Sequence, residues 1–264
     1  MNKEISKGNY YILRYIAIIT MLCDHLGKVL YMTDTINNET LKVFFVIGRL
    51  SFPLFAYLLV ESFYYTKNRT KHLLQIFLIA VFSEVIFDMV FMLNKPTNFS
   101  IDALNGQNVC FTLAFGWLCL MVTKLNLKER IFRVFKFKKE RTAKVLNTFL
   151  KCGIISTIIL LSAPLSMDYM IIGLVFILML NYARNSKMCK LWQLNSFTVF
   201  ILTSGNIYYM YAYISLIFVY LASKLRVPNR IENVVASDVS AVCCRFFYPV
   251  HLAALLLVKT LLVV

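Results

Sequence analysis

The sequence predicts an all-α fold, a polytopic integral membrane bundle of about nine transmembrane helices with a cytoplasmic N-terminus. Of the 264 residues, 59% are hydrophobic and only 16% are charged, against about 25% charged residues in soluble domains. The apolar residues form runs close to the roughly 20 residues that a helix needs to cross a bilayer. Basic residues collect in alternate loops, as cytoplasmic loops do. We therefore expect one transmembrane domain over residues 1–264.

Nine apolar segments are the expected spans. They cover residues 9–31, 43–65, 72–93, 108–124, 146–163, 167–183, 190–204, 206–222 and 246–264. The first is interrupted by Asp24 and His25 and lacks a small-residue cleavage site, which favours a spanning helix over a signal peptide. Pro53 is expected to kink or weaken the second. The sixth and seventh are short, and only residues 204–206 separate the seventh from the eighth, so either could be partly re-entrant.

The charge pattern sets the orientation. There are 28 basic and 13 acidic residues, a net charge of +15. The loops after the second, fourth, sixth and eighth segments are basic, which puts them on the N-terminal, cytoplasmic side and leaves the C-terminus outside. The basic run 124–144 indicates topology and anionic lipid rather than nucleic acid, because no groove-reading motif surrounds it. Residues 128–141 fit either an interfacial amphipathic helix or a solvated loop, and 231–245 are too polar to span.

The seven cysteines do not favour a disulfide framework or a metal site, because their number is odd and no CxxC motif occurs. Most lie in apolar runs, where a thiol behaves as a small hydrophobic group. Adjacent Cys243 and Cys244 have two interpretations. They are candidates for acylation near the membrane surface, or they only pack.

Ionisable residues inside predicted spans are functional candidates, because charge is costly in a membrane. With about 1.5 Å of rise per residue, they fall into two layers. The outer layer contains Asp24, His25, Arg49, Glu84 and Asp88. The inner layer contains Arg14, Glu61, Arg245, Tyr248 and His251.

Spacing within the outer layer suggests partners for His25. Glu84 and Asp88 are four residues apart and share a helix face. Asp24 and His25 are adjacent, so their side chains point about 100° apart. We therefore expect a carboxylate of the third helix to orient His25, and Arg49 to pair with one of the acids.

The spacing of Arg14 and His25 puts both on one stripe of the first helix. Eleven steps of about 100° complete three turns to within roughly 20°. A neutral imidazole can accept a proton from a nucleophile at physiological pH. The alternative is that His25 only makes a packing hydrogen bond to Asp88 or Glu84. His251 has two interpretations as well: it contacts a ligand at the cytoplasmic face, or it is a packing group between helices.

Six segments together resemble the signature blocks of the TraX family, in the expected order along nearly the whole chain. They are IAIITMLCDHLG at 16–27, GRLSFPLFAYLLVE at 48–61, SEVIFD at 83–88, NVCFTL at 108–113, DY at 168–169 and FYPVHL at 247–252. The sequence departs from the family pattern at Ser62, where Gly is expected, and at Ile86, where Pro is expected. These departures affect helix packing more than the ionisable residues.

The resemblance implies an activity. TraX proteins are bacterial membrane proteins associated with conjugation, and the founding member is linked to N-terminal acetylation of pilin. The family is similar to transmembrane acyltransferases, whose first helix carries an Arg, ten residues and a His, as Arg14 and His25 do here. It implies acetyl transfer in the cytoplasmic membrane, from cytoplasmic acetyl-CoA to an amine or hydroxyl. The acceptor, a pilin-like peptide, a glycan or a lipid, would lie at or beyond the outer face.

Roles follow from this expectation. His25 would be the general base or carry the acyl group briefly, and Arg49 would organise the carboxylates or stabilise an oxyanion. The rest of the expected catalytic set is Asp24, Glu84 and Asp88. Residues expected to bind the donor are Arg14, Glu61, Arg245, Tyr248 and His251. The rivals are a proton-coupled transporter or permease component, although no internal repeat is found, and a non-catalytic conjugation assembly factor.

Overall fold

The computed structural model describes residues 5–91, 107–125, 140–163, 169–205, 207–224 and 238–263. All regular structure in these ranges is helical. The helices are α1 (Lys7–Met32), α2 (Asn38–Gly48), α3 (Ser51–Tyr65), α4 (Arg69–Phe91), α5 (Val109–Lys124), α7 (Glu140–Ser162), α8 (Met170–Asn185), α9 (Cys189–Thr203), the 3₁₀ helix η3 (Ile207–Tyr211), α10 (Ala212–Lys224) and α12 (Asp238–Val263). Within the described ranges, each of the nine predicted segments overlaps one helix or two consecutive helices.

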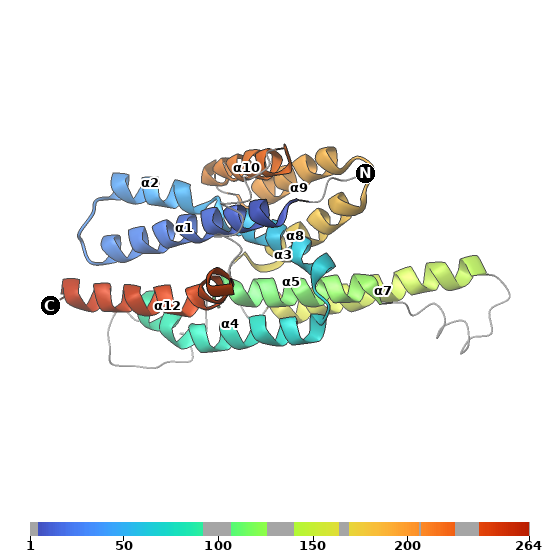
Figure 1. Ribbon diagram of the computed structural model, residues 1–264, viewed down its shortest axis with the longest axis horizontal. Coiled ribbons are helices and arrows are strands. Elements are labelled where there is room, and N and C mark those ends of the chain that lie inside the picture. The colour runs from blue at the N-terminus through green and yellow to red at the C-terminus, as the bar shows by residue number, and fades with distance from the viewer. Residues whose placement is uncertain are drawn as a thin grey trace.

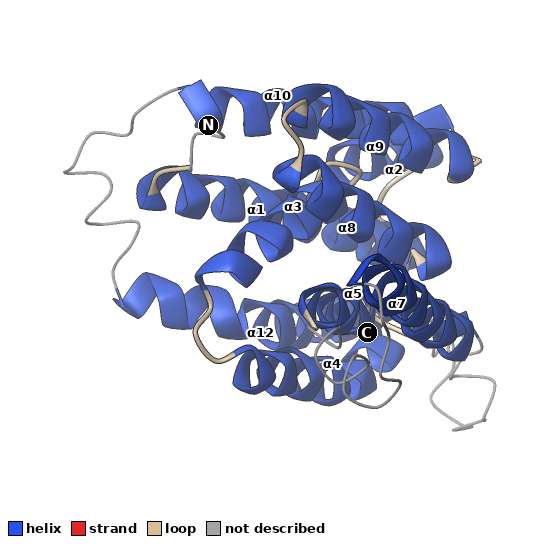
Figure 2. Ribbon diagram, turned by 90° about the vertical axis from the view of Figure 1, so that its right-hand side faces the viewer, coloured by secondary structure: helices blue, strands red, loops and turns tan. Residues whose placement is uncertain are grey.

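The helices lie roughly parallel to one long axis (Figure 1). Viewed from the end, α9 and α10 cover one side of the bundle, while α4, α5, α7 and α12 form the other, with α1, α3 and α8 between them (Figure 2). Helix α3 is the most enclosed, and nearly every side chain from Ser51 to Glu61 is buried. Helix α7 is peripheral, with large apolar side chains exposed along it.

Five helical stretches in the described ranges are long and apolar enough to cross a membrane. They are Lys7–Met32, Asn38–Tyr65, Arg69–Phe91, Arg141–Ser162 and Ile207–Lys224. Shorter apolar helices cover Val109–Lys124, Ile171–Asn185 and Phe246–Leu262. The prediction of a helical membrane protein is supported, while the crossing number and the cytoplasmic N-terminus stay predictions.

The second predicted span is one helical stretch that is interrupted by a short turn at Arg49 and Leu50, where the backbone keeps right-handed helical angles. Helix α2 ends at Gly48 and α3 begins at Ser51, so the interruption lies in the turn that precedes Pro53, where a proline is expected to disturb a helix. Pro53 lies in the first turn of α3, where no helical N–H is required. Neighbouring helices supply hydrogen bonds at the break: Ser215 Oγ donates to the Leu50 carbonyl at 3.1 Å, and Ser51 Oγ donates to a carbonyl of α1.

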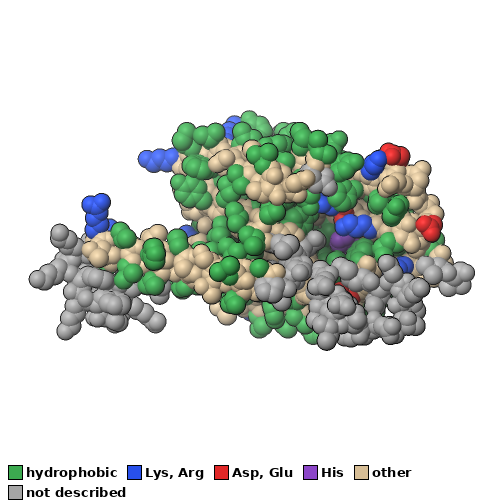
Figure 3. All heavy atoms as spheres, turned by 180° about the vertical axis from the view of Figure 1, so that it is seen from behind, with side chains coloured by type: hydrophobic (Ala, Val, Ile, Leu, Met, Phe, Trp, Pro, Cys, Tyr) green, Lys and Arg blue, Asp and Glu red, His purple; other side chains and the backbone are tan. Residues whose placement is uncertain are grey.

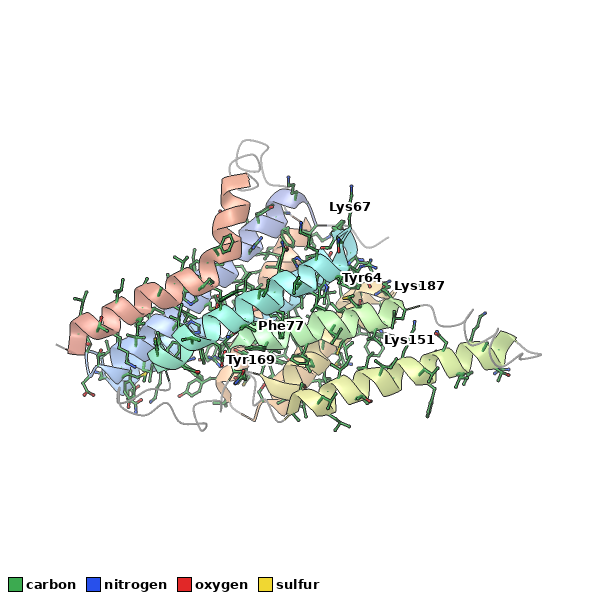
Figure 4. All side chains as sticks on the ribbon, turned by 90° about the horizontal axis from the view of Figure 1, so that it is seen from below. Tyr64, Lys67, Phe77, Lys151, Tyr169 and Lys187 are labelled. Carbon is green, nitrogen blue, oxygen red and sulfur yellow. The ribbon has the colours of Figure 1, made fainter. Side chains whose placement is uncertain are left out.

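The last helix begins earlier than expected. Residues 238–245, which the sequence suggests are too polar to span, form the first two turns of α12. Figure 4 shows α12 bent along its length, and Pro249 inside it removes one helix hydrogen bond. The possible amphipathic stretch 128–141 lies almost wholly outside the described residues, as do the side chains of Cys243 and Cys244.

Candidate functional site

Two buried histidines meet where α1 and α12 pack together. His25 Nδ1 and His251 Nε2 lie 2.9 Å apart, and the two side chains are 6% and 4% exposed. The residues are 226 positions apart in sequence. Burial of two imidazoles in one contact requires that each finds a hydrogen-bond partner, because an unpaired polar group is costly away from water.

The hydrogen bonds define one consistent set of tautomers. His251 Nδ1 lies 3.0 Å from the Phe247 carbonyl, which can only accept. His251 Nδ1 therefore carries the proton, and in the neutral ring Nε2 is the acceptor. His25 Nδ1 must then donate to it, which leaves the lone pair of His25 on Nε2. The arrangement gives His25 the tautomer that a general base needs, with its basic nitrogen directed away from His251.

Aromatic rings surround this pair. Phe91 and Phe87 of α4 lie with ring centroids 5.2 and 6.5 Å from His25. Tyr248 is 6.4 Å from His25 and 5.2 Å from His251. Apolar edges on several sides hold the His25 ring in one orientation.

A charged triplet lies one residue away on α1. Asp24 accepts from Arg49 Nη2 at 3.0 Å through Oδ1 and from Lys28 Nζ at 2.6 Å through Oδ2. The Asp24 and Arg49 side chains are 8% and 6% exposed, and Lys28 is 37% exposed. The expected pairing of Arg49 with an acid of this layer is thus observed with Asp24. Two cations share one carboxylate, so the triplet has a net positive charge.

Arg49 is fixed on several sides. Its Nε donates to the Phe45 carbonyl at 3.3 Å, and its Nη1 donates to the Tyr209 hydroxyl at 2.9 Å. The guanidinium carbon is 3.8 Å from the centroid of the Phe45 ring and 5.0 Å from that of Tyr209. A planar cation held by rings and hydrogen bonds is preorganised.

His25 and the charged triplet line the same cavity of about 250 Å³. Aromatic side chains complete its wall, among them Phe45, Phe52, Tyr169 and Tyr209. Figure 3 shows this region as a hollow with a histidine at its base and basic side chains at its edge. In the described ranges no group of three or more His, Cys, Asp or Glu is placed to hold a metal ion.

Tyr169 adopts an uncommon backbone conformation at this wall. Its φ is +62°, immediately before α8. The ring stacks on Phe52 with centroids 3.8 Å apart and planes 10° apart. A left-handed backbone is unfavourable for an aromatic residue, so the stacking that accompanies it compensates part of that cost.

The expected role of Glu84 and Asp88 as partners of His25 is wrong in this structure. Glu84 Oε2 accepts from the backbone N–H of Asn108 at 3.0 Å and also from its side-chain amide. Helix α4 presents Phe87 and Phe91 to His25, and Asp88 follows Phe87 by about 100° around the helix. The partner of His25 comes from α12 instead.

The depth expected for His251 and Tyr248 is also wrong. A helix beginning at 246 would place His251 about 8 Å from the inner face, whereas α12 begins at Asp238, about 20 Å before His251. Both side chains therefore lie beside His25 rather than beside Arg14. The side chain of Arg245 is outside the described residues.

The opposite end of α1 lies among other polar residues. Glu61, expected to bind the donor, accepts from Arg184 Nε at 2.9 Å. Tyr10 interacts electrostatically with both Arg14 and Glu61. Arg14 and Glu61 therefore both lie near Tyr10, while their depth in a membrane stays a prediction. Arg184 could not be assigned a partner from sequence, because α3 and α8 are far apart in the chain.

Basic side chains gather around Tyr64 at this end. The guanidinium carbon of Arg184 lies 3.8 Å and the ammonium nitrogen of Lys124 4.7 Å from the centre of the Tyr64 ring. Lys151 donates to the Thr123 carbonyl at 2.9 Å. Figure 4 shows Tyr64, Lys67, Lys151 and Lys187 toward this end of the molecule, with Tyr169 nearer the middle.

Sequence reasoning missed several residues of the cavity wall. The sequence analysis gives no functional role to Lys28, Tyr169 or Tyr209, all of which line the cavity. One signal was available for Lys28, which follows Asp24 by four residues on one helix face. The tyrosines offered no such signal, because only tertiary packing brings them to Arg49.

Comparison with known proteins identifies relatives. A family model described as "TraX protein" matches residues 10–259. A probable fimbrial assembly protein FimC, serogroup H1, from Dichelobacter nodosus is 30% identical over 127 residues, 47% of this chain and 50% of that protein. The chain thus spans about half the length of this curated relative. No solved structure matches the chain.

Proposed function

The chain belongs to the TraX family, and from this premise we propose that it is a membrane acetyltransferase related to pilus or conjugation machinery. The donor would be acetyl-CoA and the acceptor a hydroxyl or amine. The name of the fimbrial assembly relative supports the pilus-related setting. The observation that carries the chemical part is the histidine pair, which leaves the lone pair of His25 on Nε2, in a residue that lines the cavity.

His25 is the proposed general base. Its Nε2 takes the proton from the acceptor while the acceptor oxygen or nitrogen bonds to the carbonyl carbon of the thioester. Collapse of the tetrahedral intermediate breaks the carbon–sulfur bond, and His25 returns the proton to the departing thiolate. The products are the acetylated acceptor and free CoA thiol.

His251 is the proposed positioning residue. Its Nε2 accepts from His25 Nδ1, and its own Nδ1 donates to the Phe247 carbonyl. This chain of hydrogen bonds selects the reactive tautomer of His25 and supports the imidazolium as it forms. His251 would therefore orient the His25 ring, a role that the sequence predicts for Glu84 or Asp88.

Arg49 is the proposed electrostatic group. It is buried from bulk solvent and is held by hydrogen bonds to Phe45 and Tyr209. Arg49 and His25 line the same cavity. Developing negative charge on the carbonyl oxygen would be stabilised by such a preorganised cation. Asp24 holds Arg49 in place rather than acting on substrate.

The donor phosphates fit the basic end of the bundle. Lys124 and Arg184 gather there on the Tyr64 ring, and Arg14 lies near Tyr10 of the same helix end. Charge-assisted contacts to phosphate suit such side chains. About 16 Å of helix rise separates Arg14 from His25. Donor binding and proton transfer are thereby assigned to different ends of α1.

The test is release of CoA thiol by detergent-purified protein, measured in variants that each lack one histidine. His25→Ala should lower turnover by roughly 10²- to 10⁴-fold and leave CoA binding unchanged. His72→Ala is the matched control, because the ring of His72 packs on Trp117 away from the cavity. A His25→Ala variant with wild-type turnover would refute the proposal. Absence of thioester turnover in the wild type would favour the transporter or assembly interpretations.

The positioning role needs its own comparison. His251→Phe keeps the ring but removes the acceptor, and should lower kcat more than it raises KM. His251→Gln restores an acceptor oxygen and should recover part of kcat. Equal activity of the two variants would show that His251 only packs.

A further inference from the structure

The described residues that line the cavity beside His25 carry an unbalanced charge. Among them, Lys28 and Arg49 face one carboxylate, Asp24, and each of its oxygens accepts from one of these cations. A second negative group would neutralise the site, whereas an ammonium would increase its excess positive charge in surroundings of low polarity.

Arg49 retains donors for such a group. It has five N–H groups, and the described residues supply acceptors for three: Asp24 Oδ1, the Tyr209 hydroxyl and the Phe45 carbonyl. One N–H on each terminal nitrogen is left without an acceptor among the described residues. Lys28 Nζ likewise gives one of its three donors to Asp24. Oxyanions such as phosphate and carboxylate match these donors.

The cavity size limits the ligand to a small head group. At about 250 Å³ it is below the usual range of roughly 300–1,000 Å³ for drug-sized ligands. Its aromatic wall, formed by Phe45, Phe52, Tyr169 and Tyr209, would enclose a polyol or a single sugar ring. A hydroxyl of that group would then lie within the same cavity as His25.

We infer that the acceptor is an anionic hydroxyl compound, a sugar or polyol carrying a phosphate or carboxylate, rather than a peptide amine. This inference rests on the proposed function. Lys28 and one free N–H of Arg49 bind the oxyanion, the other free N–H of Arg49 is left for the carbonyl oxygen of the thioester, and His25 deprotonates a hydroxyl of the same molecule. The acceptor oxygen forms an acetyl ester, the thioester carbon–sulfur bond breaks, and the proton passes through His25 to the CoA thiolate.

The first experiment measures binding without turnover. Thermal stabilisation of the purified protein is compared for glycerol 1-phosphate and glycerol, which differ only in the anion. The wild type should bind glycerol 1-phosphate at least tenfold more tightly. Lys28→Gln should reduce this preference by about tenfold or more, in line with loss of a charged hydrogen bond. Lys42→Gln is the control, because Lys42 pairs with Glu39 and does not line the cavity.

The second experiment follows the acetyl group. Radiolabelled acetyl-CoA is supplied with glycerol 1-phosphate, with nanodiscs containing phosphatidylglycerol or only phosphatidylcholine, and with a peptide that has a free N-terminus. Label in a hydroxylamine-labile ester of the soluble phosphate or of phosphatidylglycerol supports the inference and separates a soluble from a lipid source. Preferential labelling of the peptide amine overturns it while leaving the acetyltransferase proposal intact.

The two experiments distinguish the two proposals. Equal affinity for glycerol and glycerol 1-phosphate overturns the anionic acceptor, whatever the turnover. Preferential binding of the phosphate without any release of CoA thiol leaves an anion site in place and refutes the acetyltransferase.

Discussion

Gly48→Ala tests the closest approach in the candidate site. An added Cβ at Gly48 would lie 2.3 Å from Asp24 Oδ1 and 2.4 Å from Asp24 Cβ. Restoring ordinary contact requires roughly 1 Å more separation between α2 and α1, which costs about 1–3 kcal/mol as overpacking. Moving Asp24 also weakens its 3.0 Å contact with buried Arg49. Complete loss of such a pair costs about 3–5 kcal/mol. Partial weakening adds about 1–2 kcal/mol to the overpacking cost, so we expect a total of about 2–5 kcal/mol.

The assay is thermal unfolding of detergent-purified protein, followed by tryptophan fluorescence. A loss of this size should lower Tm by on the order of 10 °C, at about 2–4 °C per kcal/mol for a chain of this length. Gly153→Ala is the control, because a Cβ there meets nothing within 4 Å. It should stabilise α7 by about 0.5–1 kcal/mol through helix propensity. A Gly48→Ala protein that unfolds within 2 °C of the wild type would refute the close packing of Gly48 on Asp24.

Other predictions concern packing, pairing and topology. Phe52→Ala should destabilise the protein by about 3 kcal/mol in thermal unfolding, because Phe52 is 1% exposed, whereas Phe149→Ala, at 75% exposed, should change it by less than about 0.5 kcal/mol. A double-mutant cycle of Glu61→Gln and Arg184→Gln should give a coupling of about 1 kcal/mol, and additive effects would contradict the ion pair. A periplasm-dependent reporter inserted within 126–139 should be inactive if the N-terminus is cytoplasmic, and activity would reverse the topology.

Sequence predicted the helices well because the signal for them is local. Apolar runs bounded by charged or turn-forming residues mark the predicted segments without reference to the rest of the chain. The break at Arg49–Leu50 had no comparable signal, since both residues are compatible with a helix. One of the hydrogen bonds to the Leu50 carbonyl comes from Ser215, 165 positions away. Pro53 indicated the region of the break but not its position.

The sequence predicted most of the residues of the candidate site, but it predicted only some of the contacts between them. Depth alone placed Asp24, His25 and Arg49 together, because helix rise is regular. Depth failed for His251, since the polar residues from Asp238 onward extend α12 and shift its register. It also could not show which face of α4 meets His25. That face carries Phe87 and Phe91, while Glu84 accepts a hydrogen bond from Asn108, the N-cap residue of α5.

The interruption between α2 and α3 has an electrostatic consequence. Each helix carries a dipole, with partial negative charge at its C-terminal end and partial positive charge at its N-terminal end. The end of α2 at Gly48 and the start of α3 at Ser51 flank Arg49, so both kinds of partial charge reach the cavity at one depth. The carbonyl end of α2 stabilises the guanidinium, as the bond from Arg49 Nε to Phe45 illustrates. The N-terminal amide groups of α3 add a positive field at the cavity. In a continuous helix these groups would be hydrogen-bonded, and the positive partial charge would lie at the N-terminal end of the whole span.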